Sequence, residues 1–355
     1  MAYQFDRDYL CAFAAFADAA DTTLEYQEKN TVVSSRRAQA QNEKVWSKDV
    51  YQKERRLEYK AIDNYFDECI TPPFHFEFDF TYDINNPCGA GNITAANVDD
   101  FGFNKNFANQ ILTLFAGYKD RELGLIGHHQ VVSRQTRREG ADTLTVFQTQ
   151  VLPAIDRKQN IDWHCPAGAN FLKNIVQLCE RFDIEAGHSV EQLYEALSNG
   201  KEAETEAKKE YSASGTFVQI MDDLCEKLQT KWLFAPADDP KNPNRRVEIF
   251  TVDANGFCFP FSTGGISQMR ISQESGLTKF PTPDVKVIYD GNSPVVEYSG
   301  ETLLNPLIKV GTRLIIEDVQ GKKSTADMYV SKVRHQGSFY GDFWCTTFSG
   351  RPAQD

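Results

Sequence analysis

The stretch FHFEFDFTYDI, residues 74–84, alternates without a break between apolar and polar side chains. Side chains of a β-strand point alternately to its two faces, so this pattern predicts a strand with one apolar and one hydrophilic face. The apolar face must pack on a hydrophobic core, which restricts the chain to folds that bury one side of a sheet. The polar face carries Glu77, Asp79 and Asp83, and the sequence leaves open what lies opposite these acids.

Further strand signals surround this segment. Three strand-like runs follow it at 109–118, 123–138 and 142–152, and the Gly and Asp residues between them are typical of tight turns. From about residue 266 the chain again consists of short strand-like runs bounded by Gly, Asn, Pro and Asp. Both regions are therefore predicted to be antiparallel β modules of barrel or sandwich type.

The middle of the chain predicts helices. Residues 166–184 and 215–234 each begin with a turn of small residues, carry apolar side chains at helical spacing and lead to a β-type segment. This repeated order is a weak internal resemblance. A polar stretch between them, 187–214, contains a charge run and reads as a helix-rich insertion.

The first seventy residues also predict helix. The apolar side chains of DYLCAFAAFADAA, residues 8–20, lie at helical spacing in an alanine-rich stretch. The polar stretch 39–70 has few apolar positions, so we expect it to dock through one narrow stripe or to become ordered against a neighbour. Pro72 and Pro73 end this region, because proline cannot continue a helix.

Together these signals predict a mixed α+β fold that is mainly β, with two antiparallel β-barrel modules flanking an α/β middle. The predicted units are a helical N-terminal extension at 1–73, a first β-barrel at 74–152, an α/β middle at 153–265 with the helical insertion at 187–214, and a second β-barrel at 266–355.

Charge and hydropathy narrow the classes of function. The 355 residues carry a net charge of −12, whereas a general nucleic-acid binder needs a basic surface that releases counterions from phosphate. No apolar run approaches the roughly 18–20 residues of a membrane span, so none is predicted. The first residues contain acids where a signal peptide carries positive charge. We therefore expect a protein that is made and folded in a cytosol.

Sequence patterns for catalysis, metals and cofactors are missing. The eight cysteines are scattered and form no CxxC pair, so they are interpreted as buried free thiols of a reducing compartment. His128 and His129 are neighbours in a predicted strand, so they point to opposite faces and cannot easily share a metal ion. Cys165 follows His164 directly, and adjacent residues seldom form a nucleophile–base pair. We predict no enzymatic activity, no catalytic residue, no cofactor and no metal site.

Several segments follow one another in a recognisable order. In NPLIKVGTRLIIED (305–318) an Asn-Pro turn precedes a strand, and MYVSKVRHQGSFYGDFWCTTFSG (328–350) joins a V-R-H-x-G hairpin to an aromatic strand. Upstream, 103–148 contains AGY, then LGLIG, then the turn REGAD. In this order the segments resemble baseplate hub proteins of tailed bacteriophages. The resemblance covers roughly residues 74–355 and leaves out the first seventy residues and 187–214.

The resemblance implies an architecture and a function. Such hubs are trimers in which each chain carries two barrels related to the tail-tube protein, so that three chains present six barrels. The trimer caps the sixfold tail tube, adapts it to a threefold tip and continues the DNA channel. The implied partners are two further copies of the chain, the tail tube or distal tail ring protein, a spike, needle or fibre-anchoring protein, and DNA only in transit. The implied location is the virion tail, after assembly in the host cytoplasm.

Four residues are candidates for an interface in such a trimer. Arg334 and His335 either fix a subunit or ring contact, or Arg334 pairs with an acid such as Asp342 at the end of the barrel. Phe343 and Trp344 alternate on the last strand, so one is predicted to enter the core while the other faces outward toward a neighbour.

The acids of the opening strand have two interpretations. Glu77, Asp79 and Asp83 face either bulk water or the channel, where an acidic wall would repel DNA phosphates and let the genome pass.

Two other functions remain open from the sequence. The chain is alternatively the hub of a phage-derived injection or secretion device, which would share the fold and the trimer. It is otherwise a tail-tip enzyme in which the hub fold carries a lytic site. The sequence separates neither the phage from the derived device nor contractile from other tails.

Overall fold

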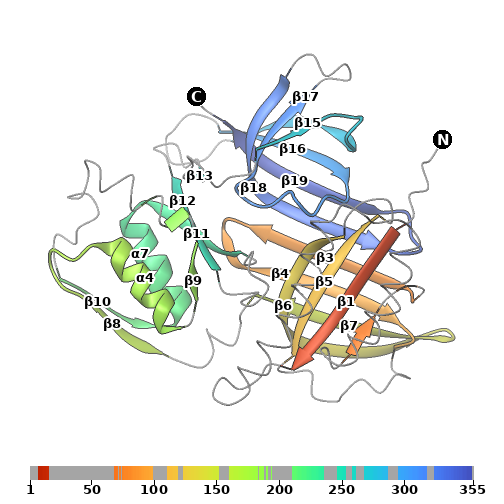
Figure 1. Ribbon diagram of the computed structural model, residues 1–355, viewed down its shortest axis with the longest axis horizontal. Helices are drawn as coiled ribbons and strands as arrows, with labels where there is room; N and C mark the ends of the chain where they lie inside the picture. Colours follow the sequence, from red (N-terminus) through yellow and green to blue (C-terminus); the bar gives the residue numbers. More distant parts are fainter. Residues whose placement is uncertain are drawn as a thin grey trace, which may run out of the picture.

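The computed structural model of the chain places a mainly β body beside a smaller α/β unit (Figure 1). It describes residues 7–15, 68–70, 72, 74–98, 110–118, 123–151, 160–182, 184–187, 189–190, 193, 210–235, 246–252, 258–260, 268–286, 295–317 and 324–353. The helices predicted within 39–67 and within most of 187–214 lie outside these residues.

One thirteen-stranded sheet contains both predicted β regions. Its main path has the order β15-β16-β19-β18-β3-β4-β7-β6-β5-β1-β2, while β17 also pairs with β18, and β14 with β17. The first region contributes β1 (Arg7–Ala15), β2 (Glu68–Ile70), β3 (Phe76–Asp83), β4 (Asn86–Ala96), β5 (Gln110–Tyr118), β6 (Gly124–Glu139) and β7 (Asp142–Gln150). The second contributes β14 (Gln268–Ile271), β15 (Leu277–Lys286), β16 (Val295–Leu303), β17 (Arg313–Glu317), β18 (Ser324–Ser338) and β19 (Trp344–Pro352).

The mainly β, α+β character of the fold is confirmed, but the closed barrels are not. β5, β6 and β7 lie where the sequence predicts strands. Among the described residues, however, the sheet remains open, and the two β regions merge because β18 pairs antiparallel with β3. A closed barrel needs its first and last strands to pair with each other. Here β3, the first strand of the predicted first barrel, pairs with β18 of the second β region instead.

β3 shows the alternation that its sequence predicts. Phe76, Phe78 and Phe80 are buried, whereas the polar residues between them are only partly covered. The Phe80 ring lies against two glycines of neighbouring strands, Gly91 of β4 and Gly127 of β6. A Cβ atom at either glycine would lie 2.5 Å or less from the ring, so these positions require glycine for the aromatic side chain to fit.

β1 corrects a prediction. Residues 7–15 and 68–70 of the predicted helical segment form strands that pair with each other, and β1 also pairs antiparallel with β5 along its whole length. Tyr9, Cys11 and Phe13 are fully buried there. Helix propensity differs between residues by only about 0.7 kcal/mol or less, while burying one large apolar side chain contributes about 1.5–3 kcal/mol. Sheet pairing and burial therefore outweigh the helical tendency of the alanines.

The α/β unit contains the two described helices. α4 (Phe171–Arg181) and α7 (Phe217–Lys227) are the predicted helices and have equal length. They are accompanied by a hairpin-like pair, β8 (Ile161–Cys165) and β10 (Tyr211–Gly215), and by a small sheet of β9 (Glu185–Ala186), β11 (Thr230–Ala235), β12 (Arg246–Val252) and β13 (Cys258–Pro260).

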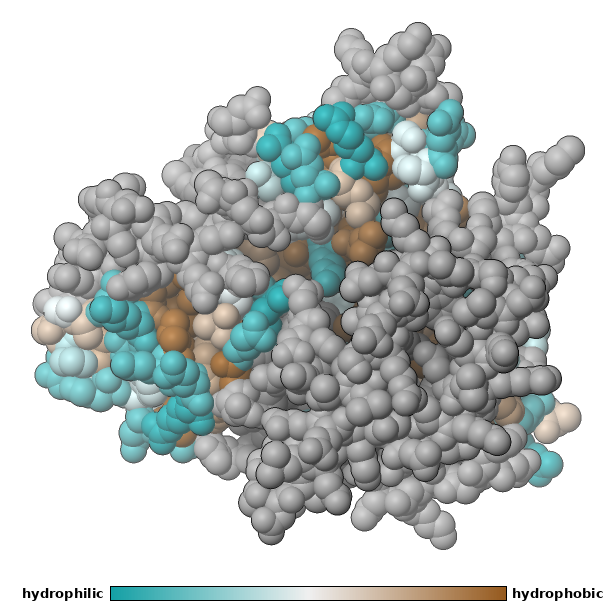
Figure 2. Space-filling view, viewed as in Figure 1, coloured by the Kyte–Doolittle hydropathy of each residue, from teal (hydrophilic) through white to brown (hydrophobic). Residues whose placement is uncertain are grey.

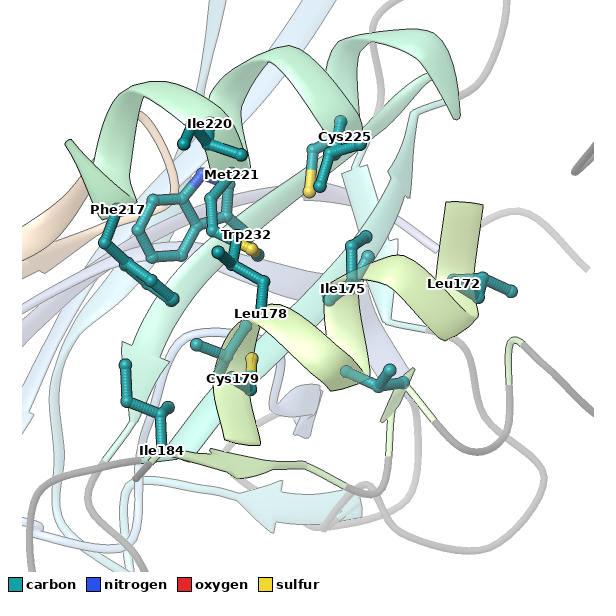
Figure 3. Packing of buried hydrophobic residues seen from close by; sticks show 14 of the residues in the cluster. Leu172, Ile175, Leu178, Cys179, Ile184, Phe217, Ile220, Met221, Cys225 and Trp232 are labelled. Atoms are coloured by element: carbon teal, nitrogen blue, oxygen red, sulfur yellow. The ribbon is translucent and has the colours of Figure 1, made fainter. Parts of the chain in front are cut away.

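Both helices begin at side-chain caps. Asn170 accepts from the backbone N–H groups of Leu172 and Lys173, and Thr216 forms a capping box with Gln219. The apolar stripes then face each other over β11, as Figure 3 shows. The labelled residues include Leu172, Ile175, Leu178 and Cys179 of α4, Phe217, Ile220, Met221 and Cys225 of α7, and Trp232 of β11.

A small apolar cluster joins the α/β unit to the β body. Leu233 of β11 and Phe250 of β12 pack with Ile84, which directly follows β3, and with Val310 of the second β region. Gly311, with φ +89°, brings its backbone close to the Phe250 ring. On the face shown in Figure 2, hydrophilic and hydrophobic side chains of the described residues are interspersed.

Candidate functional site

The seam between β18 and β3 carries most of the candidate residues. The strands pair antiparallel over Lys332–Ser338 and Glu77–Asp83. Because side chains alternate along both strands, one face of the seam holds the acids of β3 and the polar side chains of β18, while the other face holds the aromatic side chains of the core.

Asp79 is paired with Arg334 on the outer face of the seam. The guanidinium donates from Nε to Oδ1 at 2.8 Å and from Nη2 to Oδ2 at 2.5 Å, which is a bidentate pair. Hydrogen bonding to Asp79 raises the pKa of Arg334. Gln336 also donates to Asp79 at 3.4 Å. Arg334 therefore pairs with an acid of its own chain, as one of the two interpretations expects, and this acid is Asp79 on the neighbouring strand.

The other two acids of β3 also have partners. Lys332 Nζ lies 3.4 Å from Asp83 Oδ2. The Ser338 hydroxyl donates to Glu77 Oε1 at 2.9 Å, and His75 Nε2 lies 3.4 Å from the same oxygen. The polar face of β3 is thus balanced by cations and donors, so it is less acidic than its sequence suggests.

His335 lies on the inner face of the seam. It is 2% exposed, and its Nδ1 lies 2.9 Å from the Thr346 hydroxyl oxygen on β19. Burial, with a contribution from the Lys309 cation, lowers its pKa to about 3. His335 is therefore neutral at ordinary pH and contacts residues of its own chain.

Trp344 also belongs to the interior. Its indole Nε1 donates to the carbonyl oxygen of Gly117 at 3.0 Å, and its ring meets Phe78 edge-on at 5.1 Å between centroids. The Tyr118 hydroxyl donates to the Trp344 carbonyl oxygen at 3.0 Å. Trp344 therefore fastens β19 of the second β region to β5 and β3 of the first.

Phe343 takes the opposite side, as the alternation predicts. It is 44% exposed, and Tyr340 in the same turn is 64% exposed. Arg7 of β1 donates to the carbonyl oxygens of Ser338 and Gly341, so the turn between β18 and β19 is held in place. Both aromatic side chains are exposed in the described chain, and the Tyr340 ring also stacks on His75.

The histidines and cysteines weighed for chemistry serve structural contacts. His128 Nδ1 lies 2.6 Å from the Thr113 hydroxyl oxygen, and burial lowers the pKa of His128 to about 3. Burial raises the pKa of the Cys165 thiol, which disfavours a thiolate nucleophile. Within the described residues no group of three or more His, Cys, Asp or Glu side chains could hold a metal ion. Within the same residues no helix is long and apolar enough to cross a membrane.

Comparison with known proteins gives structural likenesses only. The sequence matches no protein-family model and no curated protein. The structure of a Francisella PdpA–VgrG complex matches with a TM-score of 0.54, 9% identity, and coverage of 98% of this chain and 53% of that chain. The E. coli c3393 protein, a component of the type VI secretion system described as similar to the T4 bacteriophage tail proteins gp27 and gp5, matches with a TM-score of 0.51, 10% identity, and coverage of 80% and 75%.

The chain shares the fold of these two proteins, which we call the tail-hub fold. A tail protein from Neisseria meningitidis is also similar, at a TM-score of 0.48 and 8% identity, over 78% of this chain and 91% of that one. The resemblance that the sequence motifs predict is thus confirmed for the fold. Identities of 10% or less transfer no residue roles. The chain spans only about half of the matched chain of the Francisella complex.

Within this tail-hub fold, sequence reasoning missed two residues. Arg7 connects β1, and Tyr82 connects β3, to parts of the chain that are distant in sequence. In the sequence, Tyr82 is one of several aromatic residues of the alternating strand, and Arg7 is one of many charged residues. Their partners lie far away along the chain, so no local pattern could have identified them.

Proposed function

We propose that the chain is a structural subunit of a tail tip or of a related injection device, without enzymatic activity. The observation that carries this proposal is the tail-hub fold, which spans 98% of the chain in the match to the VgrG complex. The clusters of polar side chains described above support a structural role, because they hold strands together and are bound to one another.

In this proposal the working unit is a homotrimer that caps a tail tube, adapts sixfold to threefold symmetry and continues a channel. Each chain contributes two β regions, so three chains present six. The partners would be the tail tube or distal ring protein on one side and a spike, needle or fibre-anchoring protein on the other. The chain would reside in the virion tail, with DNA only in transit.

We assign the channel wall to the outer face of β3 and β18. The pairs Asp79–Arg334 and Asp83–Lys332 support a wall that is polar and nearly neutral. Such a surface would hold neither phosphates nor cations strongly, so a charged polymer could slide along it. In this proposal a charged polymer passes freely because the wall is nearly neutral, and not because unpaired acids repel its phosphates.

A second candidate is the hub of a phage-derived secretion device. The structures matched with TM-scores of 0.54 and 0.51 are a Francisella PdpA–VgrG complex and a component of the E. coli type VI secretion system. Both candidates share the proposed trimer. The cargo differs, because a secretion device would pass protein rather than DNA.

Cryo-electron microscopy and native mass spectrometry of the full chain test the proposal. We expect three copies and threefold density with two similar β regions per chain. Phe343→Asp should give a folded monomer, because an unpaired charge is costly in an interface. Phe280→Asp is the matched control, since Phe280 is also exposed, at 39%, but lies on β15. A sixfold ring, or hydrolysis of peptidoglycan that depends on one His or Cys, would contradict the proposal.

A further inference from the structure

Tyr82 lies where the three large hydrophobic cores of the chain meet. Its ring packs against the core of the first β region, the core of the second and the core of the α/β unit. Its hydroxyl donates to the carbonyl oxygen of Ile126 at 2.8 Å. β3 therefore carries one side chain that contacts every part of the fold.

Two buried histidines flank this tyrosine. The Tyr82 hydroxyl oxygen lies 3.1 Å from His129 Nε2, and the two ring centroids are 5.6 Å apart. The His335 ring lies on another side, 6.5 Å away between centroids. His129 belongs to β6 of the first β region and His335 to β18 of the second, so each region supplies one imidazole.

Neutral hydrogen bonds hold both imidazoles. His129 Nδ1 lies 3.1 Å from the Thr149 hydroxyl oxygen of β7, whose hydroxyl also donates to the carbonyl oxygen of Gly91 in β4 at 3.2 Å. His335 Nδ1 is bound to Thr346 of β19, which contacts the backbone of Asn305. Since the Tyr82, Thr149 and Thr346 hydroxyls donate to carbonyl oxygens, burial rather than hydrogen bonding keeps the two rings uncharged.

Among the described residues, one cation and one further imidazole act on the two rings. Lys309, in the loop after β16, acts on His335 and lowers its pKa. His128, the neighbour of His129, is itself titratable and electrostatically coupled to it. On the side of the α/β unit Tyr82 meets an apolar core, against which Cys88 of β4 also packs. The acids Asp79 and Asp83 lie on the opposite face of β3.

We propose that Tyr82, His129 and His335 form an acid-sensitive latch, which holds the three parts of the chain together at neutral pH and releases them on acidification. The inference stands on the fold alone and does not need the proposed trimer or its cargo.

Proton binding drives the release. Burial holds the pKa of His129 and of His335 at about 3, against 6.5 in water. When the junction opens, both rings reach water and recover their ordinary pKa, so the open form binds protons that the closed form excludes. Between these two pKa values each ring shifts the equilibrium toward the open form by about tenfold per pH unit. At pH 4.5 the shift relative to pH 7 is about a hundredfold for each ring.

Hydrogen exchange of the full chain between pH 7 and 4, corrected for the intrinsic pH dependence of exchange, tests the latch. We expect amides of the β3–β18 seam to lose protection in acid before the amides inside α4, α7 and β5–β6. The double variant His129→Gln/His335→Gln, which cannot gain a charge, should open at least about one pH unit lower. Small-angle scattering should show the same shift as a delayed increase in the radius of gyration.

His128→Gln is the matched control. His128 is the next residue, is buried to a similar degree and has a similarly lowered pKa, but it contacts Thr113 rather than Tyr82. It should leave the opening pH of the seam unchanged. Tyr82→Phe is a second, conservative variant that should raise seam exchange at pH 7 by about tenfold, since it removes the hydroxyl that contacts Ile126 and His129.

Three results would overturn the latch. The first is simultaneous loss of protection in the seam and in the interior of each part, which is ordinary acid unfolding. The second is an equal shift of the opening pH by His128→Gln and by the double variant. The third is a seam that stays protected at pH 4.

Discussion

The indole Nε1 of Trp344 donates a 3.0 Å hydrogen bond to the carbonyl oxygen of Gly117. These residues are separated by more than two hundred positions, and they belong to β19 and β5, which do not pair with each other. The bond therefore ties the second β region to the first independently of the β18–β3 seam. The Arg7 guanidinium lies over the same indole, with its Cζ 5.7 Å from the ring centroid.

Replacing this indole should be among the most damaging single changes in the β body. Trp344→Ala removes a nearly fully buried ring and should lower the free energy of unfolding by about 3–5 kcal/mol. Trp344→Phe keeps a ring but leaves the Gly117 carbonyl without this donor, at a cost of about 1–3 kcal/mol. Urea denaturation measures both values. Phe343→Ala is the control and should change the stability of the isolated chain by less than about 0.5 kcal/mol. If Phe343→Ala lowered the stability as much as Trp344→Ala, the structural role of the buried indole would be contradicted.

The Arg334–Asp79 pair should contribute little to stability despite its bidentate geometry. Its side chains are 45% and 32% exposed, and solvent screens such pairs. A double-mutant cycle of Arg334→Gln and Asp79→Asn should give a coupling energy of about 1 kcal/mol or less, which falls with added salt. A coupling of several kcal/mol that does not depend on salt would show that the face is covered.

Gly127 should not tolerate even alanine. The added Cβ would lie 2.3 Å from the Phe80 ring, so Gly127→Ala must displace a fully buried aromatic side chain. We expect a loss of about 1–3 kcal/mol in thermal or urea unfolding. The double variant Gly127→Ala/Phe80→Leu supplies the space and should be less destabilised than the sum of its single changes. Strict additivity would rule out the clash as the cause.

Acid should destabilise the whole chain through three buried histidines. Burial lowers the pKa of His128, His129 and His335 to about 3, whereas the unfolded chain binds these protons near 6.5. Between these values the unfolded state binds more protons, so the free energy of unfolding falls as the pH falls. Each histidine contributes about 1.4 kcal/mol per pH unit. Urea titrations at pH 7, 6 and 5 measure the slope, and His128→Gln should reduce it by about one third; an unchanged slope would contradict this account.

The cap of α7 offers a local test in the α/β unit. Thr216→Ala removes the acceptor for the Gln219 backbone N–H and one half of the capping box. The expected cost is about 1 kcal/mol, while Thr216→Ser should be nearly neutral because it keeps the hydroxyl. Thermal unfolding monitored by circular dichroism distinguishes the two variants, and equal effects would indicate lost packing rather than a lost cap.

Elements with a complete local signal could be predicted from the sequence. The alternation of β3, the turns around β6 and β7, and the apolar stripes and caps of α4 and α7 all lie within short segments. The sequence predicts only part of the placement of Phe343 and Trp344. Alternation separates the two rings, but only the presence of Phe78 and Gly117 selects Trp344 for the interior.

The sequence by itself determined the strand and helix periods, the buried parity of β3 and, through the order of its motifs, the likeness to tail hubs. Only the tertiary structure decided that residues 7–15 form a strand, that the two β regions share one open sheet, and that Arg334 neutralises Asp79. The reason is physical. Periodicity records which face of an element is apolar, whereas partner choice depends on contacts between segments far apart in the chain, and their free energy exceeds the small local propensities.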